Sequence, residues 1–131
     1  MKSHARVGII GGGIMGVSLL YHLSKEGWKD LVLIEKGELT SGSTWHAAGQ
    51  CPHFVGSFNA AKIHNYSNKL YQELEKETGQ ATGWHGCGSL RLALKQEDID
   101  WFHYVKGILD NVGSPAEIVS KEKILDLHPF L

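Results

Sequence analysis

The chain has 131 residues, of which 42% are hydrophobic and 21% are charged, and its 13 Lys and Arg residues nearly balance 14 Asp and Glu residues. This composition predicts one compact soluble domain and offers nucleic acid no basic surface to bind. No apolar run reaches the roughly 18 residues of a membrane-spanning helix, so we expect no membrane partner.

The beginning of the chain and its cysteine content bear on the cell compartment. The first six residues are too short and too polar for a signal peptide, and two cysteines are too few for a disulfide framework. A reducing compartment fits both features. We therefore expect a bacterial cytoplasmic protein, or a mature mitochondrial matrix protein if the source is a eukaryote.

The first part of the chain predicts a strand, a helix and a second strand. Residues 7–10 and 31–34 are short apolar runs typical of buried strands, and residues 14–26 have apolar side chains at helical spacing. Gly27 is placed to end the helix in the left-handed conformation. Two strands joined through a helix form the βαβ unit of a parallel sheet, so the predicted fold class is α/β.

Capping residues and periodicity predict the elements that follow. We expect four further helical segments, at residues 44–48, 57–78, 97–111 and 120–127. In the first of these, Ser43 is the candidate N-cap. On the 57–78 helix, Ile63, Tyr66, Leu70 and Leu74 share the predicted apolar face. Alternating leucines predict a half-buried strand over 89–94, and 117–119 is a candidate short strand.

A glycine-rich loop lies between the first predicted strand and helix. Residues 11–16, Gly-Gly-Gly-Ile-Met-Gly, satisfy the pattern G-x-G-x-x-G, and Glu35 ends the second strand about 20 residues later. In such a loop, Gly11 permits the tight turn, Gly13 lets the backbone approach a pyrophosphate, and Gly16 lets helix and strand pack closely. An acidic residue at position 35 favours the ADP-ribose of FAD or NAD over NADP. The plain alternatives are an ordinary glycine turn and a solvated glutamate.

Several motifs resemble the FAD enzymes of the D-amino-acid-oxidase-like superfamily. The segment 7–16, Tyr21-His22-Leu23 and Glu35-Lys36 resemble the N-terminus of that superfamily. Residues 39–49, Leu-Thr-Ser-Gly-Ser-Thr-Trp-His-Ala-Ala-Gly, are more specific and closely resemble the dimethylglycine and sarcosine dehydrogenase branch. The similarity continues through 62–64, 75–79 and 88–93, so it covers nearly the whole chain.

The resemblance implies a cofactor and a set of residues that hold it. The chain would be the N-terminal βαβ part of a Rossmann-like FAD-binding domain, followed by helices and short strands. His46 would carry the flavin covalently through the 8α-methyl group, whereas Trp45 is as compatible with a core position as with flavin contact. The implied cofactor contacts are Gly11, Gly13, Ile14, Met15, Gly16, Glu35, Lys36, Gly42, Ser43, Thr44, Trp45, His46, Ala47, Ala48, Gly49 and Gln50.

The same resemblance implies a reaction and its partners. An N-methyl amine would be oxidised by hydride transfer to the flavin, and the iminium product would be captured by water or tetrahydrofolate. An electron-transfer flavoprotein would then reoxidise the cofactor. No substrate-binding residue of the family matches a motif in this stretch, and the catalytic residues stay unknown. Family members have several hundred residues, so we expect a truncated piece, inactive alone, that lacks the substrate-binding and C-terminal folate-type domains.

Three other interpretations remain open at this point. The chain is alternatively a non-catalytic nucleotide-binding fragment or an NAD-type Rossmann protein, although an NAD site has no use for the string at residues 39–49. The pairs Cys51/His53 and His85/Cys87 contain four residue types that bind zinc, but their spacing matches no recognised zinc motif. We therefore predict no metal site, with both cysteines buried as small apolar residues.

Overall fold

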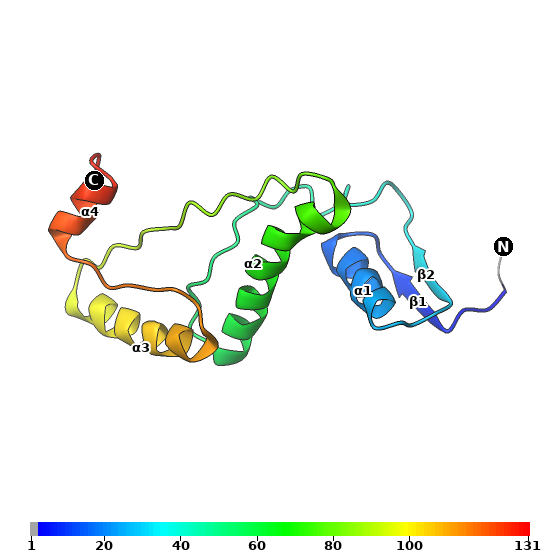
Figure 1. Ribbon diagram of the computed structural model, residues 1–131, viewed down its shortest axis with the longest axis horizontal. Helices are drawn as coiled ribbons and strands as arrows, with labels where there is room; N and C mark the ends of the chain where they lie inside the picture. The colour runs from blue at the N-terminus through cyan, green and yellow to red at the C-terminus, as the bar shows by residue number, and fades with distance from the viewer. Residues whose placement is uncertain (1–2) are drawn as a thin grey trace. The chain divides into compact units, whose positions relative to one another are not determined.

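The computed structural model describes residues 3–131 and divides the chain into two compact units, Met1–Gln50 and Cys51–Leu131 (Figure 1). Composition alone predicts a single domain. No helix in the described part of the chain combines the length and apolar character needed to cross a bilayer.

The first unit contains the predicted parallel βαβ arrangement. Strand β1 (Val7–Ile10), helix α1 (Ile14–Lys25) and strand β2 (Leu31–Ile34) agree with the predicted ranges to within one residue. The two strands pair in parallel, with the first residue of β1 opposite the first residue of β2. Gly27 follows α1 at a φ of 79°, which confirms its expected left-handed conformation. The α/β fold class is therefore confirmed for this unit.

The two further strands predicted downstream are wrong. Residues 89–94 and 117–119 have no strand partner, and the sheet of the described residues contains β1 and β2 alone. The side chain of Leu94 is 89% exposed, so the alternating leucines do not cover a core here. Alternation predicts which side of a strand is apolar, but a strand also needs a neighbour to bond its backbone groups.

The second unit is helical and confirms three predicted helices. These are α2 (Phe58–Thr78), α3 (Gln96–Val112) and α4 (Lys121–Leu127). The hydroxyls of Ser57 and Ser120 accept hydrogen bonds from the first turns of α2 and α4, as N-caps do. Gly79 and Gly113 end α2 and α3 in the left-handed conformation.

The core of the second unit lies between α2 and α3. Ala61 on α2 packs against Val105 and Leu109 on α3, and all three are buried. The N-terminal part of α2 and the C-terminal part of α3 meet in this core (Figure 1). The predicted apolar face of α2 is not the face that packs here, because Ile63 is 66% exposed. A small alanine permits close helix contact, and Tyr66 on the predicted face is likewise 54% exposed.

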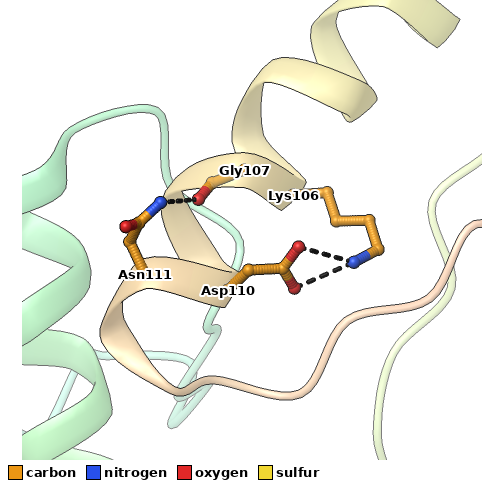
Figure 2. A network of polar contacts seen from close by, with 4 residues as sticks. All are labelled: Lys106, Gly107, Asp110 and Asn111. Carbon is orange, nitrogen blue, oxygen red and sulfur yellow. Dashed lines mark hydrogen bonds and ion pairs between the residues drawn. The ribbon is translucent and has the colours of Figure 1, made fainter.

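Two polar contacts between side chains and groups one helical turn apart lie on different sides of α3 (Figure 2). The ammonium of Lys106 lies 2.8 and 2.7 Å from the two carboxylate oxygens of Asp110, one helical turn later. The Asn111 amide donates a 2.7 Å hydrogen bond to the carbonyl oxygen of Gly107. An i,i+4 ion pair such as that of Lys106 and Asp110 stabilises a helix by only about 0.3–0.5 kcal/mol.

Candidate functional site

The glycine loop connects β1 to α1 through a turn that needs small residues. Gly11 has a φ of 104°, and its N–H donates a 2.8 Å hydrogen bond to the carbonyl oxygen of Ile34 at the end of β2. A Cβ atom added to Gly16 would collide with the carbonyl oxygen of Gly11. The loop therefore brings the start of α1 against the end of the two-stranded sheet, as the sequence pattern predicts.

The backbone donors at the start of α1 are shared between the chain and the pocket. The Ile14 N–H donates to the Thr44 hydroxyl oxygen at 2.9 Å. In contrast, the N–H groups of Met15 and Gly16 make no hydrogen bond to any described residue. Unpaired N–H groups in the first turn of a helix are suited to bind an anion. Ile14 and Met15 are both among the expected cofactor contacts. The N–H of Met15 is available, whereas that of Ile14 is already bonded.

Glu35 follows β2 and its carboxylate faces the glycine loop. One oxygen accepts a 2.6 Å hydrogen bond from the N–H of Gly12, and the other accepts a 3.0 Å bond from the N–H of Gly37. These bonds, that from Gly12 first, hold the pKa of Glu35 below its usual value of 4.5. The group is therefore a carboxylate at neutral pH. Because a carboxylate can accept about four hydrogen bonds, Glu35 retains capacity for a ribose diol.

The segment that follows Glu35 is a series of turns and not the predicted helix over 44–48. The N–H groups of Trp45, His46 and Ala47 each donate to the carbonyl oxygen three residues earlier. Trp45 N–H also bonds the carbonyl of Thr40, and Thr40 itself has a φ of 65°. Within the described chain, the Ser43 hydroxyl caps no helix, so that expectation is wrong. The Thr44 side chain is directed to α1, and no regular four-residue ladder forms.

His46 lies on these turns with an exposed side chain. Its Nδ1 atom is 2.9 Å from the carbonyl oxygen of Gly42. A carbonyl can only accept, so this contact places the proton on Nδ1 of the neutral ring and leaves the lone pair on Nε2. The expected position of His46 in the first turn of a helix, near its N–H donors, is wrong.

The glycine loop, Glu35 and the turn segment together line a pocket of about 560 Å³ in the first unit. This volume is within the usual range of small-molecule sites. Eleven of the predicted cofactor residues line it, namely Gly11, Gly13, Ile14, Met15, Gly16, Glu35, Lys36, Gly42, Ser43, Thr44 and Ala47. The convergence of free N–H donors, glycine backbone and a carboxylate suits a nucleotide with a pyrophosphate and a ribose.

Other predicted residues lie outside this lining, and some lining residues were not predicted. The residues not found in it are Trp45, His46, Ala48, Gly49 and Gln50. Trp45 instead borders a smaller hollow of about 330 Å³, and its 78% exposure excludes a core position. The unpredicted lining residues are Ile10, Gly37, Thr40 and Ser41. Ile10, Thr40 and Ser41 lie inside the segments 7–16 and 39–49, and Gly37 directly follows Glu35-Lys36, so the full extent of these motifs was the available signal.

The considered zinc ligands do not form a site. Among residues 3–131, no group of three or more His, Cys, Asp or Glu side chains is arranged to hold a metal ion. Cys51 and Cys87 are both exposed, so the expectation that they are buried is wrong.

A parallel βαβ unit with a glycine loop and an acidic residue after its second strand defines a dinucleotide-binding α/β domain. Residues 6–131 match the DAO family, described as FAD dependent oxidoreductase, and the chain belongs to this family. The resemblance stated from the sequence motifs is thereby confirmed.

Individual relatives refine this assignment. The chain is 50% identical over 130 residues to dimethylglycine dehydrogenase, mitochondrial, of Rattus norvegicus, covering 99% of the chain and 15% of the relative. It is 47% identical over 131 residues to pyruvate dehydrogenase phosphatase regulatory subunit, mitochondrial, of Mus musculus, covering 100% of the chain and 15% of the relative. The chain thus spans a small part of the length of these relatives.

A solved structure supports the fold independently. L-proline dehydrogenase from P. horikoshii superposes with a TM-score of 0.80 at 22% identity, over 98% of this chain and 34% of that protein. At this identity the likeness concerns the fold alone.

Proposed function

We propose that this chain forms the N-terminal FAD-binding part of an amine oxidoreductase that oxidises an N-methyl amine. The observation that carries the proposal is the pocket in which the glycine loop, the Glu35 carboxylate and the turn segment meet. The 50% identity to a dimethylglycine dehydrogenase supports the substrate class. When bound, FAD would supply the two-electron acceptor for the amine.

The residues of the pocket have distinct roles in this proposal. The free N–H groups of Met15 and Gly16, at the positive end of α1, bind the pyrophosphate. Glu35 keeps its bond to Gly12 and accepts from the ribose hydroxyls, while Lys36 flanks the same ribose. Residues 42–50 extend from the pocket along the ribityl chain and the flavin ring.

We also propose that His46 attaches the flavin covalently through Nε2. The bond from Nδ1 to the Gly42 carbonyl leaves Nε2 as the nucleophilic nitrogen, and the side chain is exposed. His46 would hold the flavin through a bond from Nε2 to the 8α carbon, with one hydrogen of that methyl group and the hydrogen on Nδ1 leaving as protons. The two electrons would pass to dioxygen, which with the two protons gives hydrogen peroxide.

One experiment tests both the cofactor and its attachment. The purified chain is incubated with FAD and precipitated with acid, and visible spectra of pellet and supernatant are recorded. We expect a yellow pellet from the wild-type chain and a yellow supernatant from His46→Ala. His103→Ala, an exposed change on α3, should behave like wild type. A protein that takes up no FAD overturns the cofactor proposal, and a yellow pellet from His46→Ala overturns the assignment of His46.

A second function is favoured by the mouse relative, whose name describes a regulatory subunit. In that case the chain belongs to a non-catalytic member of the family. Anaerobic addition of dimethylglycine to the FAD-loaded whole protein distinguishes the two: bleaching of the oxidised flavin band supports the oxidoreductase, and an unchanged band supports the non-catalytic protein.

We propose two further partners, for the whole protein and not for this chain alone. The family resemblance supports tetrahydrofolate as acceptor of the one-carbon unit and an electron-transfer flavoprotein as oxidant. The names of the rat and mouse relatives support a mitochondrial location for a eukaryotic source. We propose the matrix as the compartment in that case, and the cytoplasm for a bacterial source.

A further inference from the structure

Thr44 differs from its neighbours in the turn segment by its contact with α1. Its hydroxyl oxygen accepts the Ile14 N–H at 2.9 Å, although thirty positions separate the two residues. The N-cap of α1 is Gly13, which has no side chain to make this bond. Thr44 therefore does from a distant loop what an N-cap side chain ordinarily does at the helix itself.

The environment of Thr44 supports a positioning role. It is partly buried, whereas the residues on either side, Ser43 and Trp45, are exposed. A second tie supports the same attachment, because the Thr40 N–H donates to the Gly12 carbonyl oxygen at 2.9 Å. The turn segment is thus fixed to the glycine loop at two points, of which Thr44 supplies the one that uses a side chain.

Two backbone hydrogen bonds of the turn segment connect the residues around Thr44 with His46 and Ala47. The His46 N–H bonds the Ser43 carbonyl at 3.2 Å, and the Ala47 N–H bonds the Thr44 carbonyl at 3.3 Å. The His46 ring is held by its own contact with the Gly42 carbonyl. Only Trp45 separates Thr44 from His46 in the chain, so a displacement of Thr44 should also displace His46.

We propose that Thr44 is a positioning residue for His46: its hydroxyl caps α1 from the turn segment and thereby fixes the imidazole in the orientation that leaves Nε2 free. The consequence for covalent attachment rests on the proposed function. The cap on α1 and the orientation of the His46 ring do not rest on the proposed function, because both are present in the structure without a cofactor.

The test compares Thr44→Val, which lacks the hydroxyl at nearly the same size, with Thr44→Ser, which keeps it. Without FAD, hydrogen exchange at the Ile14 amide should be about fivefold faster in Thr44→Val, as expected for the loss of one cap bond. The ring ¹⁵N shifts of His46 should show loss of the preference for a proton on Nδ1. Thr44→Ser should restore both. Thr82→Val is the matched control, because the Thr82 hydroxyl also accepts from a backbone N–H, at 3.3 Å, in the other unit.

The outcomes separate this proposal from the function on which part of it rests. Wild-type exchange at Ile14 in Thr44→Val overturns the cap, and unchanged His46 ring shifts overturn the positioning of His46. Thr44→Val keeps a methyl group and loses the hydroxyl, whereas Thr44→Ser keeps the hydroxyl and loses the methyl group. Equal losses in the two variants would show that the effect does not come from the hydroxyl, which also overturns the proposal. With FAD, the pellet should turn yellow about fivefold more slowly in Thr44→Val. If wild type binds no FAD, the proposed function fails while the exchange and ring shifts still decide the role of Thr44.

Discussion

The Glu35 carboxylate accepts a 2.6 Å hydrogen bond from the backbone N–H of Gly12, and this bond ties the end of β2 to the glycine loop. Gly12 is buried, and a Cβ atom added to it would lie 3.1 Å from the Cβ of Glu35. The bond therefore forms where backbone and side chain are already in close contact. The residue expected to bind ribose also holds the loop expected to bind phosphate, so its charge affects both.

Replacing Glu35 with Gln should weaken FAD binding and change its pH dependence. The pKa of Glu35 is lowered in the folded chain, so the stabilisation by its carboxylate is complete above 4.5 and is lost as pH falls through the folded value. Wild-type FAD affinity should therefore fall only at acidic pH, as Glu35 takes up a proton at its lowered folded-state pKa, and Glu35→Gln should show low affinity with a flatter profile. Fluorescence titration with FAD across this range gives the measurement.

A matched control for this prediction is Glu73→Gln, an exposed change on α2. It should leave both the affinity and the pH profile as in wild type. If Glu35→Gln keeps the acid-induced loss of affinity, another group causes that loss.

The helices and strands were predictable where apolar runs and capping residues within the segment itself are sufficient to define them. Strands β1 and β2 are uninterrupted apolar runs, and Ser57 with Gly79 mark both ends of α2 in the sequence. The 89–94 segment shows the limit of such reasoning. Its alternating leucines define an apolar side, but whether a neighbouring strand pairs with it is decided by contacts far along the chain.

The candidate site was predictable in its residues and less so in its geometry. Spacing was sufficient to find the glycine loop and Glu35, because each role depends on one short motif. The bond between Ile14 and Thr44 was not foreseeable, since it joins a helix start to a turn without any periodic signal.

Gly16→Ala should destabilise the first unit, because the added methyl group collides with the Gly11 carbonyl oxygen. Overpacking of this kind costs about 1–3 kcal/mol of the free energy of unfolding. Urea unfolding, with hydrogen exchange in α1 as the local probe, gives the measurement. Gly107→Ala on α3 has open space around its Cβ and should instead stabilise by up to about 1 kcal/mol. Equal effects of the two changes would contradict the close packing at Gly16.

Two asparagines make equally short bonds to backbone carbonyls but differ in burial. The Asn65 amide donates to the Val112 carbonyl at 2.7 Å inside the second unit, and Asn111 donates to Gly107 at 2.7 Å on the exposed side of α3 (Figure 2). Asn65→Ala leaves the carbonyl at the end of α3 without its buried donor. It should cost about 1–3 kcal/mol of the free energy of unfolding.

For Asn111→Ala, water replaces the lost partner, and alanine favours the helix, so the change should remain within about 0.5 kcal/mol. Urea unfolding followed by far-ultraviolet circular dichroism compares the two variants. Similar losses in both would show that burial does not set the value of the Asn65 bond.

His53 connects the start of the second unit to the turn after α3. Its Nδ1 atom lies 3.1 Å from the Ser114 hydroxyl oxygen, and Ser114 is buried. Burial of the ring, and next the charge of His64, lower the pKa of His53 from its usual 6.5. The neighbouring His64 ring is itself held 2.8 Å from the Pro52 carbonyl oxygen. Adding a proton to His53 thus places charge in a partly buried position.

The second unit should therefore lose stability as the solution becomes acidic. A lowered folded-state pKa means that the unfolded chain takes up the proton first, so the contribution of His53 is complete above 6.5 and is lost as pH falls toward the folded value. Urea unfolding at about pH 7.5 and about pH 5 should show this decrease, and His53→Gln should reduce it because glutamine does not titrate. His103→Gln, an exposed change on α3, is the control and should keep the wild-type decrease. If His53→Gln retains the full pH dependence, the destabilisation comes from other groups.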